Sequence, residues 1–303
     1  MNVLSLFDGM SCGRIALDRV GFKIDNYFAS EIDKYAMQVS KANYQDIIQI
    51  GDVTKVYGGY ISEKIDLLIG GSPCQSFSNA GGDGNGFDGK SKLFWEYVRI
   101  LKEVQPTYFL LENVIMKKKE WQDIISKTLG VEPIMIDSKL VSAQRRPRLY
   151  WTNIPNVTQP QDKQILFKDI LDSDVVKYEL SDILKSRYKQ THIDNGTKLV
   201  IGTTVIEGKI GQRDRVYGVN NKIPTLTATD YKQPKQVLVD GILRKVTPLE
   251  FERLQTAPDN YTKCVSDTQR YKMLGNGWTV DVIAHILSFI NGFEKTTERG
   301  QKI

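Results

Sequence analysis

The sequence predicts an α/β protein in which a parallel sheet, covered by helices on both faces, is followed by a smaller irregular region. Two observations carry this prediction. Short apolar, β-rich runs alternate with helical patterns through about residue 155, which is typical of a parallel sheet. From about residue 156 the composition shifts to Gln, Lys, Asp and Thr, with weaker periodicity and short strands punctuated by glycine. With 303 residues, the chain is long enough for one large domain and a smaller one.

The first half contains seven expected strands and three expected helices. The strands are residues 2–7, 23–30, 46–52, 64–71, 107–114, 133–138 and 148–154. The helices are residues 14–20, 33–43 and 92–104. In the third helix one face carries Leu93, Phe94, Tyr97, Val98 and Leu101. Pro106 ends that helix, because proline cannot continue a helical hydrogen-bond ladder.

The second half returns to helical character near its end. Glycine-punctuated short strands cover residues 198–208, and helices are expected at residues 248–255 and 279–290. The apolar spacing of the last helix would pack on a sheet. We therefore expect a first domain at residues 1–155, a small region at residues 156–246, and a C-terminal segment at residues 247–303 that returns to the first domain.

Composition excludes several classes of protein. Hydrophobic and charged contents of 41% and 25% are ordinary, and no apolar run approaches the ~20 residues of a membrane-spanning helix. The first residues lack a basic segment, so no secretory signal is expected. The net charge of +5 permits a polyanionic partner but is too small to establish one.

Cysteine and histidine are scarce. Cys12, Cys74 and Cys264 are widely separated and odd in number, which predicts neither a disulfide framework nor a CxxC metal site. His192 and His285 are too few for a histidine-rich metal site or a Ser/His triad. We expect metal-free chemistry in a reducing, cytoplasmic compartment.

Polar residues follow five of the expected strands. In an open parallel sheet, ligands bind beyond the carboxyl ends of the strands, where the loops converge. The residues placed at this edge are Asp8 with Gly9, Glu31, Asp52, Pro73 with Cys74, and Glu112 with Asn113. One edge of the sheet would thus combine a glycine turn, several acids and a thiol.

The acids at this edge suggest a nucleoside ligand. Glu31 can accept hydrogen bonds from ribose hydroxyls, and Asp52 can accept one from an adenine amino group. Each residue alone is more often a solvated loop acid, so their joint placement carries the argument. Acids without a basic partner for a phosphate favour a positively charged nucleoside. Gly9 and Gly13 do not match the GxGxxG of pyrophosphate-binding loops, which disfavours a nicotinamide oxidoreductase.

Cys74 admits two interpretations from the residues alone. Free cysteine is often a small buried hydrophobe. Pro73 before it and the glycine-rich residues 76–92 after it instead suggest a nucleophile beside a mobile lid. The basic cluster Arg145, Arg146 and Arg148 could lower the pKa of such a thiol, although it could also be a solvated turn.

Six sequence blocks resemble those of one family. In chain order they are "FDGMSCG", "GGSPCQSFS", "LLENV", "QRRPR", "RVYGVNNKIPTLTA" and "LGNGWTVDVI". Together they resemble the conserved blocks of the cytosine-C5 DNA methyltransferases of phage and bacteria, and the match runs from about residue 3 to residue 283. Several local choices, such as "VLSLFDGMSCG" and "SAQRRPRLYWTNIP", are also similar to the catalytic domains of animal de novo DNA methyltransferases.

The resemblance implies a fold and a reaction. The fold would be a Rossmann-like S-adenosylmethionine-dependent methyltransferase domain with a small, irregular target-recognition domain. Cys74 as thiolate would add to C6 of a cytosine flipped out of duplex DNA, and Glu112 would hold N3 and the exocyclic amine. Arg146 and Arg148, in the family's Q-x-R-x-R pattern, would stabilise the O2 side of the base and contact the backbone.

The resemblance also implies the co-substrate, S-adenosylmethionine, and the residues that bind it. Those residues are Phe7 near the adenine, Asp8 and Gly9 at the methionine part, Glu31, Asp52, Pro73, Asn276 and Trp278. Asn276 and Trp278 would close the pocket. The partner would be duplex DNA without a membrane, in a bacterial or phage context such as restriction-modification. The oligomeric state stays open, and a monomer is compatible with the sequence.

Two features depart from the family pattern, and two other functions stay open. Lys92 stands where many relatives carry arginine, and residues 191–212 leave little chain for target recognition. An RNA-directed cytosine-C5 methyltransferase shares the cysteine and ENV blocks, although its "CFT" signature is not evident. A non-catalytic DNA-binding homologue is the other alternative, although such proteins typically lose the cysteine or the glutamate.

Overall fold

The computed structural model describes residues 1–73, 77, 86–87, 89–185, 189–194, 198–202, 205–206, 209–210 and 215–295. The chain divides into two compact units. Unit 1 comprises residues 1–137, 147–160 and 280–303, and unit 2 comprises residues 138–146 and 161–279. Each unit is described by itself.

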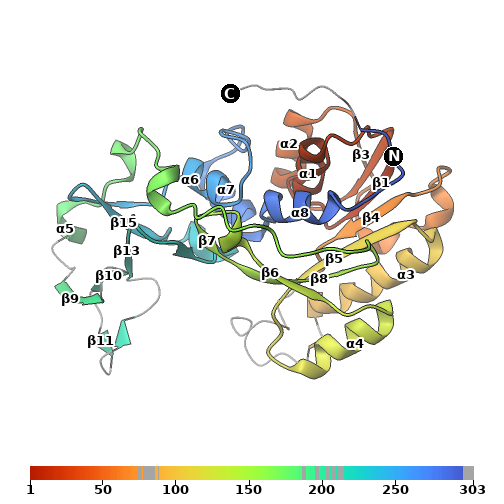
Figure 1. The fold of residues 1–303 in the computed structure, drawn as a ribbon. Helices are drawn as coiled ribbons and strands as arrows, with labels where there is room; N and C mark the ends of the chain where they lie inside the picture. Colours follow the sequence, from red (N-terminus) through yellow and green to blue (C-terminus); the bar gives the residue numbers. More distant parts are fainter. Residues whose placement is uncertain are drawn as a thin grey trace. The chain divides into compact units, whose positions relative to one another are not determined.

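Unit 1 is built on a seven-stranded sheet with the strand order β3-β2-β1-β4-β5-β8-β6 (Figure 1). The strands are β1 (Asn2–Leu6), β2 (Asn26–Ser30), β3 (Ile47–Gln49), β4 (Leu67–Gly70), β5 (Tyr108–Val114), β6 (Ile134–Asp137) and β8 (Pro147–Thr152). The first five pair in parallel, as expected from their near-continuous apolar character.

One part of the prediction is wrong, because β8 runs antiparallel to both of its neighbours, β5 and β6. Only residues 138–146 join β6 to β8. That connection is shorter than the dozen or more residues that a parallel crossover needs. The sheet is therefore mostly, not wholly, parallel.

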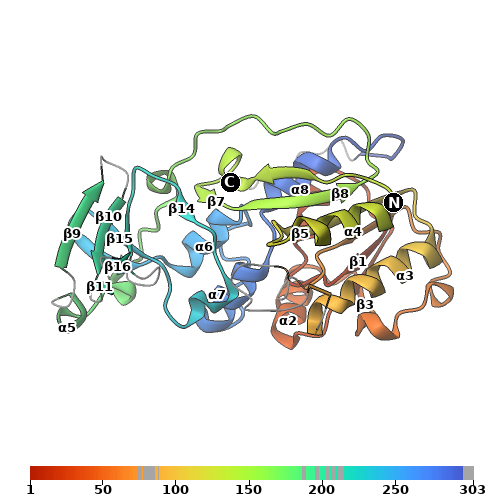
Figure 2. The ribbon, with the colours of Figure 1, turned by 90° about the horizontal axis from the view of Figure 1, so that it is seen from below.

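Helices cover both faces of this sheet, as expected. α1 (Cys12–Val20), α2 (Lys34–Asn43) and α8 (Val280–Leu287) lie on one face, and α3 (Phe94–Val104) and α4 (Lys119–Leu129) lie on the other (Figure 1). Figure 2 views the sheet from the side of α3 and α4. The sequence analysis did not predict α4, although Trp121 and Ile125 bury one of its faces at helical spacing. Short 3-10 helices are Val53–Lys55, Gly58–Tyr60 and Gly89–Leu93.

Local capping interactions explain where α2 begins and where α1 ends. The carboxylate of Asp33 accepts hydrogen bonds from the backbone N–H groups of Tyr35 and Ala36, which caps the start of α2. Gly21 ends α1 in the left-handed conformation at φ 86°, which glycine adopts without strain. The expected apolar face of α3 is confirmed at Phe94, Tyr97 and Val98, all buried.

Unit 2 consists of short strands, short helices and loops. Its strands are β7 (Gln144–Arg145), β9 (Lys189–Asp194), β10 (Lys198–Gly202), β11 (Val205–Ile206), β12 (Lys209–Ile210), β13 (Val216–Gly218), β14 (Ile223–Pro224), β15 (Gln236–Val239) and β16 (Ile242–Lys245). Its helices are α5 (Asp182–Lys185), α6 (Pro248–Leu254) and α7 (Asp267–Asn276), with 3-10 helices Ser138–Leu140, Phe167–Ile170, Val176–Tyr178 and Ala228–Tyr231. The irregular character of this region follows the prediction, whereas α7 was not predicted.

The compact units and the expected domain limits divide the chain differently. α6 and α7 belong to unit 2, and α8 belongs to unit 1. A role of residues 156–246 in target recognition stays a prediction. Within the described part of the chain, no helix is long and apolar enough to cross a membrane.

Candidate active site

The loops that follow β1 and β2 in unit 1 carry three of the predicted residues, Asp8, Gly9 and Glu31. Gly9 donates its backbone N–H to Oε2 of Glu31 at 2.7 Å. Oε1 of Glu31 accepts the backbone N–H groups of Ile32 and Asp33 at 2.7 and 2.8 Å. Glu31 therefore fixes two loops to each other and is itself held in one orientation.

The loop after β1 has an unusual backbone. Phe7, Gly9 and Ser11 have φ angles of 58°, 60° and 64°. This left-handed region suits glycine and costs other residues energy, so strain at Phe7 and Ser11 must be compensated by surrounding contacts. One such contact is the backbone hydrogen bond from Asp8 to the carbonyl of Ser30, at 3.1 Å.

Asp8 is a buried acid within this loop. Its carboxylate accepts hydrogen bonds from Ser11 Oγ at 2.5 Å and from the Tyr27 hydroxyl at 2.7 Å. Burial raises the pKa of Asp8 to about 6, and the negative charge of Glu31 acts in the same direction, while the hydrogen bonds from hydroxyls oppose it. At neutral pH the carboxylate is mostly ionised, but its charge responds to pH within the physiological range.

Asp52 lies at the end of β3 and differs from Asp8 in its environment. Its Oδ1 accepts the backbone N–H and the hydroxyl of Thr54, both at 2.9 Å. These hydrogen bonds lower the pKa of Asp52, so it is ionised throughout the neutral range. Ser30 Oγ donates to the carbonyl of Gly51 at 2.7 Å and joins the loop of β3 to that of β2.

Glu112 and Arg148 form an ion pair between the neighbouring strands β5 and β8. Arg148 Nε lies 3.0 Å from Glu112 Oε1, and both side chains are nearly buried, at 12% and 11% exposed. The antiparallel register places Glu112 opposite Tyr150 and Arg148 opposite Val114. Because two adjacent strands hold both groups, the carboxylate has a fixed position and a fixed cationic neighbour.

Asn113, which had no predicted role, connects β5 to the segment before Pro73. It is 1% exposed, and its Nδ2 donates to Oγ and to the backbone carbonyl of Ser72 at 3.1 and 3.3 Å. Ser72 precedes Pro73 and Cys74 in the chain. The signal that could have found it is an amide at the end of a buried apolar strand, because buried amides need partners.

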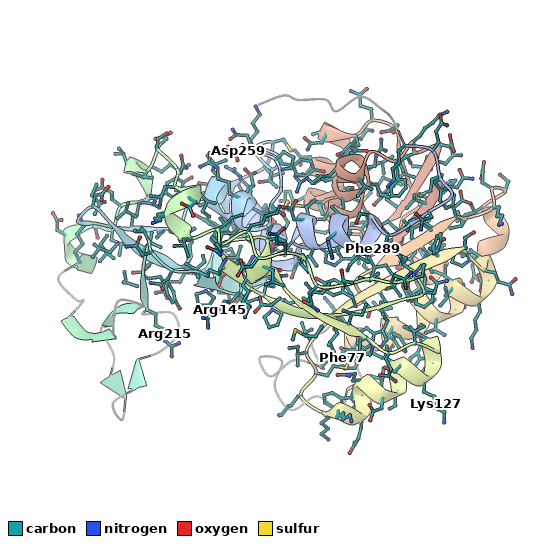
Figure 3. The ribbon with its side chains drawn as sticks, viewed as in Figure 1. Phe77, Lys127, Arg145, Arg215, Asp259 and Phe289 are labelled. Atoms are coloured by element: carbon teal, nitrogen blue, oxygen red, sulfur yellow. The ribbon has the colours of Figure 1, made fainter. Side chains whose placement is uncertain are left out.

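Cys74 and most of the glycine-rich segment 76–92 lie outside the described residues. The role of Cys74 as nucleophile and that of the segment as a lid therefore rest on the sequence. On the far side of Cys74, Phe77 is fully buried, and its carbonyl accepts the Lys117 N–H at 3.0 Å (Figure 3). The Phe77 ring contacts Phe87 and Trp121, with ring centroids 5.1 and 5.9 Å apart. The described residues that flank Cys74 are thus bound to β5 and to the segment after it.

Three other predicted residues belong to unit 2. Arg146 is 3% exposed and donates to the carbonyls of Leu226, Gly275 and Gly277, whereas Arg145 is exposed (Figure 3). Asn276 is exposed at the end of α7, and Trp278 is half-buried. Because each unit is described by itself, the closure of a cofactor pocket by Asn276 and Trp278 stays a prediction, as does contact between Arg146 and a base.

Comparison with known proteins identifies the family. Residues 1–291 match the family described as C-5 cytosine-specific DNA methylase. The chain belongs to this family. It is 33% identical to the type II methyltransferase M.HpaII of Haemophilus parainfluenzae over 92% of this chain and 86% of that protein. It is 28% identical to the type II methyltransferase M.HhaI of Haemophilus parahaemolyticus over 94% and 93% of the two chains.

Solved structures support the fold of this C-5 cytosine-specific DNA methylase. The methyltransferase EhMeth of Entamoeba histolytica has a TM-score of 0.74 at 19% identity, covering 95% of this chain and 97% of that one. A putative DNA modification methyltransferase from an Escherichia coli prophage has a TM-score of 0.69 at 21% identity, covering 95% and 98%. The predicted methyltransferase fold and family are therefore confirmed.

For a member of this family, the described residues form two groups at the carboxyl edge of the sheet. Gly9 is hydrogen-bonded to Glu31, the neighbouring Asp8 is bound to the backbone of Ser30, and Asp52 follows β3, the next strand. Glu112 and Arg148 form the second group. Among the described residues, no cluster of three or more His, Cys, Asp or Glu side chains could hold a metal ion.

Proposed function

We propose that this chain transfers a methyl group from S-adenosylmethionine to C5 of a cytosine flipped out of duplex DNA. Its membership of the C-5 cytosine-specific DNA methylase family supports the reaction. The single observation that carries the proposal is the Glu112–Arg148 ion pair at the end of β5. The next residue, Asn113, is hydrogen-bonded to Ser72, which precedes Pro73 and Cys74 in the chain. This arrangement places an acid/base group on the strand that binds the segment leading to Cys74.

The proposed reaction begins with nucleophilic attack. The Cys74 thiolate forms a bond to C6 of the flipped base, and the electron pair of the C5–C6 double bond becomes available at C5. Glu112 holds and protonates N3 and binds the exocyclic amine, which draws electron density from the ring. Arg148 holds the Glu112 carboxylate in place, since its guanidinium lies 3.0 Å away. C5 then forms a bond to the methyl carbon, whose bond to the sulfonium sulfur breaks and leaves S-adenosylhomocysteine. A base then removes the C5 proton, and the returning electron pair expels the thiolate.

The acids at the ends of β1, β2 and β3 fit S-adenosylmethionine. S-adenosylmethionine supplies an electrophilic methyl group on a positively charged sulfur. Glu31 would bind the ribose, Asp52 the adenine amino group, and Asp8 with Gly9 the methionine part. The fit rests on a fixed Glu31, held by three backbone N–H groups, and on the ionised Asp52, which together favour a cationic nucleoside. Phe7, Pro73, Asn276 and Trp278 would complete the pocket.

Covalent trapping tests the proposed reaction. Duplex DNA that contains 5-fluorocytosine should form a covalent complex with the protein in the presence of S-adenosylmethionine, because fluorine cannot leave C5 as a proton does. Cys74→Ala should abolish the complex and all methyl transfer, as seen on denaturing gels and by transfer of labelled methyl groups. Cys264→Ala, at the exposed cysteine, is the matched control and should trap as efficiently as the unmodified protein.

Two outcomes would favour the alternatives. Label transferred to RNA and never to duplex DNA would make the protein an RNA methyltransferase. DNA binding without any covalent complex would make it a binding protein that lacks catalysis.

The biological setting is also part of the proposal. Two relatives are named as type II methyltransferases, which suggests that this chain modifies DNA in a restriction-modification system in the cytoplasm. Residues 156–246 would include the target-recognition region, and residues 76–92, with Lys92, would close over the flipped base. Bisulfite sequencing of DNA from cells that express the protein should show methylated cytosines in one short sequence.

A further inference from the structure

A cluster of buried polar side chains in unit 2 holds the turn that carries Asn276 and Trp278. We propose that Gln255 is a positioning residue for the S-adenosylmethionine site, because its amide fixes the backbone on both sides of Asn276. This inference rests on the proposed function, in which Asn276 and Trp278 contact the co-substrate.

Gln255 follows α6 and is completely buried. Its Nε2 donates to the carbonyl of Leu274 at 2.6 Å and to that of Gly277 at 3.0 Å. Its Oε1 accepts the hydroxyl of Thr279 at 2.9 Å. One side chain therefore contacts the backbone before and after Asn276, and the residue that follows Trp278.

The end of α7 explains why such contacts are needed. The last carbonyls of a helix have no partner within the helix, and a left-handed glycine often terminates it. Gly277 instead has an extended conformation with φ −64° and ψ 166°. Gln255 supplies a donor to Leu274, and Arg146 supplies donors to Gly275 and Gly277, at 3.2 and 2.8 Å. Side chains thus determine where the chain turns after Asn276.

The backbone at Gly275, just before Asn276, also packs closely against the backbone of Thr227. An added Cβ at Gly275 would lie 2.2 Å from the backbone carbonyl carbon and oxygen of Thr227, which no side chain tolerates. Arg146 also donates to the neighbouring carbonyl of Leu226 at 2.8 Å. The turn is therefore fixed in three directions, by Gln255, Arg146 and the segment Leu226–Thr227.

Gln144 provides a matched comparison. It is also completely buried, and its Nε2 donates to the carbonyl of Leu254 at 3.2 Å, while its Oε1 accepts the backbone N–H of Leu226 at 2.8 Å. It meets Gln255 through a longer hydrogen bond of 3.3 Å. Its hydrogen bonds to Leu254, Leu226 and Gln255 do not reach the backbone of the turn that carries Asn276. Comparing a variant that lacks the Gln144 amide with one that lacks the Gln255 amide therefore separates an effect on the stability of unit 2 from an effect on that turn.

The experiment compares Gln255→Met and Gln144→Met in the full chain. Methionine keeps the length of the side chain and removes its polar atoms. Both variants should lose stability in urea unfolding, because each leaves buried backbone groups without partners, at about 1–3 kcal/mol per group. Gln255→Met should also weaken S-adenosylmethionine binding about tenfold by calorimetry, whereas Gln144→Met should stay within about twofold.

A milder variant, Thr279→Val, tests the same contact if Gln255→Met does not fold. Thr279→Val keeps the shape of the side chain but removes the hydroxyl that Gln255 Oε1 accepts. It should weaken S-adenosylmethionine binding about threefold, an energetic effect under 1 kcal/mol, while affinity for duplex DNA is unchanged.

The outcomes distinguish this inference from the proposed function. Unchanged co-substrate affinity in Gln255→Met, or equal weakening in both glutamine variants, would overturn the positioning role and show a purely structural one. The affinity comparison does not depend on catalysis, so it stands even if the unmodified protein binds the co-substrate without transferring methyl groups. Absence of S-adenosylmethionine binding by the unmodified protein would overturn both proposals.

Discussion

The two units of this chain are stabilised by different interactions. In unit 1 an apolar cluster that includes Leu68, Phe94 and Trp151, all fully buried, packs with the sheet. In unit 2 one apolar cluster contains Leu180, Val216 and Leu243, while Arg244 and Glu250 form a buried ion pair at 1% and 0% exposed. Apolar burial is non-directional, whereas hydrogen bonds and ion pairs specify positions. A unit with little regular structure therefore depends on polar side chains to fix its loops.

The largest expected effect breaks the polar side of this comparison. Glu250 accepts two hydrogen bonds from Arg244, at 2.7 and 2.8 Å, and the backbone N–H groups of Thr247 and Asp172. Glu250→Gln leaves the Arg244 charge buried without a counter-charge, so stability should fall by roughly 3–5 kcal/mol in urea denaturation. Glu294→Gln, at the exposed pair with Lys23, is the control and should cost under about 1 kcal/mol. Similar losses in both variants would contradict this account.

A slightly smaller effect is expected from a cavity in unit 1. Leu68 in β4 is fully buried in the apolar cluster. Leu68→Ala should lower the free energy of unfolding by roughly 2–5 kcal/mol, from lost burial and the cavity left behind. Ile48→Ala, at a side chain of β3 that is 41% exposed, should cost clearly less. The opposite order would show that packing does not dominate in unit 1.

The smallest predicted effect depends on pH and tests Asp8, a buried acid of unit 1 whose pKa is raised. Below pH 4 Asp8 is protonated in both the folded and the unfolded chain. Between about pH 4 and 6 the unfolded chain releases the proton first, so the folded state holds more protons and stability falls as pH rises. Asp8→Asn removes this dependence.

The measurement is the difference in unfolding free energy between Asp8→Asn and the unmodified protein. It should shift in favour of the variant by up to roughly 3 kcal/mol between pH 4 and 7. Asp52 gives the opposite sign, because its pKa is lowered, and Asp52→Asn should lose stability relative to the unmodified protein as pH rises from acid. A pH-independent difference for Asp8→Asn would contradict the raised pKa.

Much of unit 1 was predictable because its signals are local. Strands β1 to β5 have apolar runs that end in polar or glycine residues, and α3 has a complete apolar face. The antiparallel direction of β8 was missed, since a run of apolar residues carries no information on strand direction. α4 and α7 were missed because their apolar residues are few and their flanking residues are charged.

The candidate site was predictable in its members and less so in its connections. The sequence predicted Glu112, Arg148 and Glu31 as functional residues, but not the ion pair between the first two or the three N–H groups around the third. Asn113 and Gln255 had no assigned role. Both act through backbone carbonyls, and a carbonyl partner has no signature in the sequence.

The sequence by itself determined the family, the succession of the main strands along the chain and which residue types gather at the carboxyl edge of the sheet. Those features depend on short motifs and on periodicities of two and 3.6 residues, which are properties of neighbouring positions. Only the tertiary structure decided that Asp8 is a buried acid, that Arg148 pairs with Glu112, and that Gln255 and Arg146 hold the turn at Asn276. These contacts join residues up to 131 positions apart, and only folding brings such partners within hydrogen-bond distance.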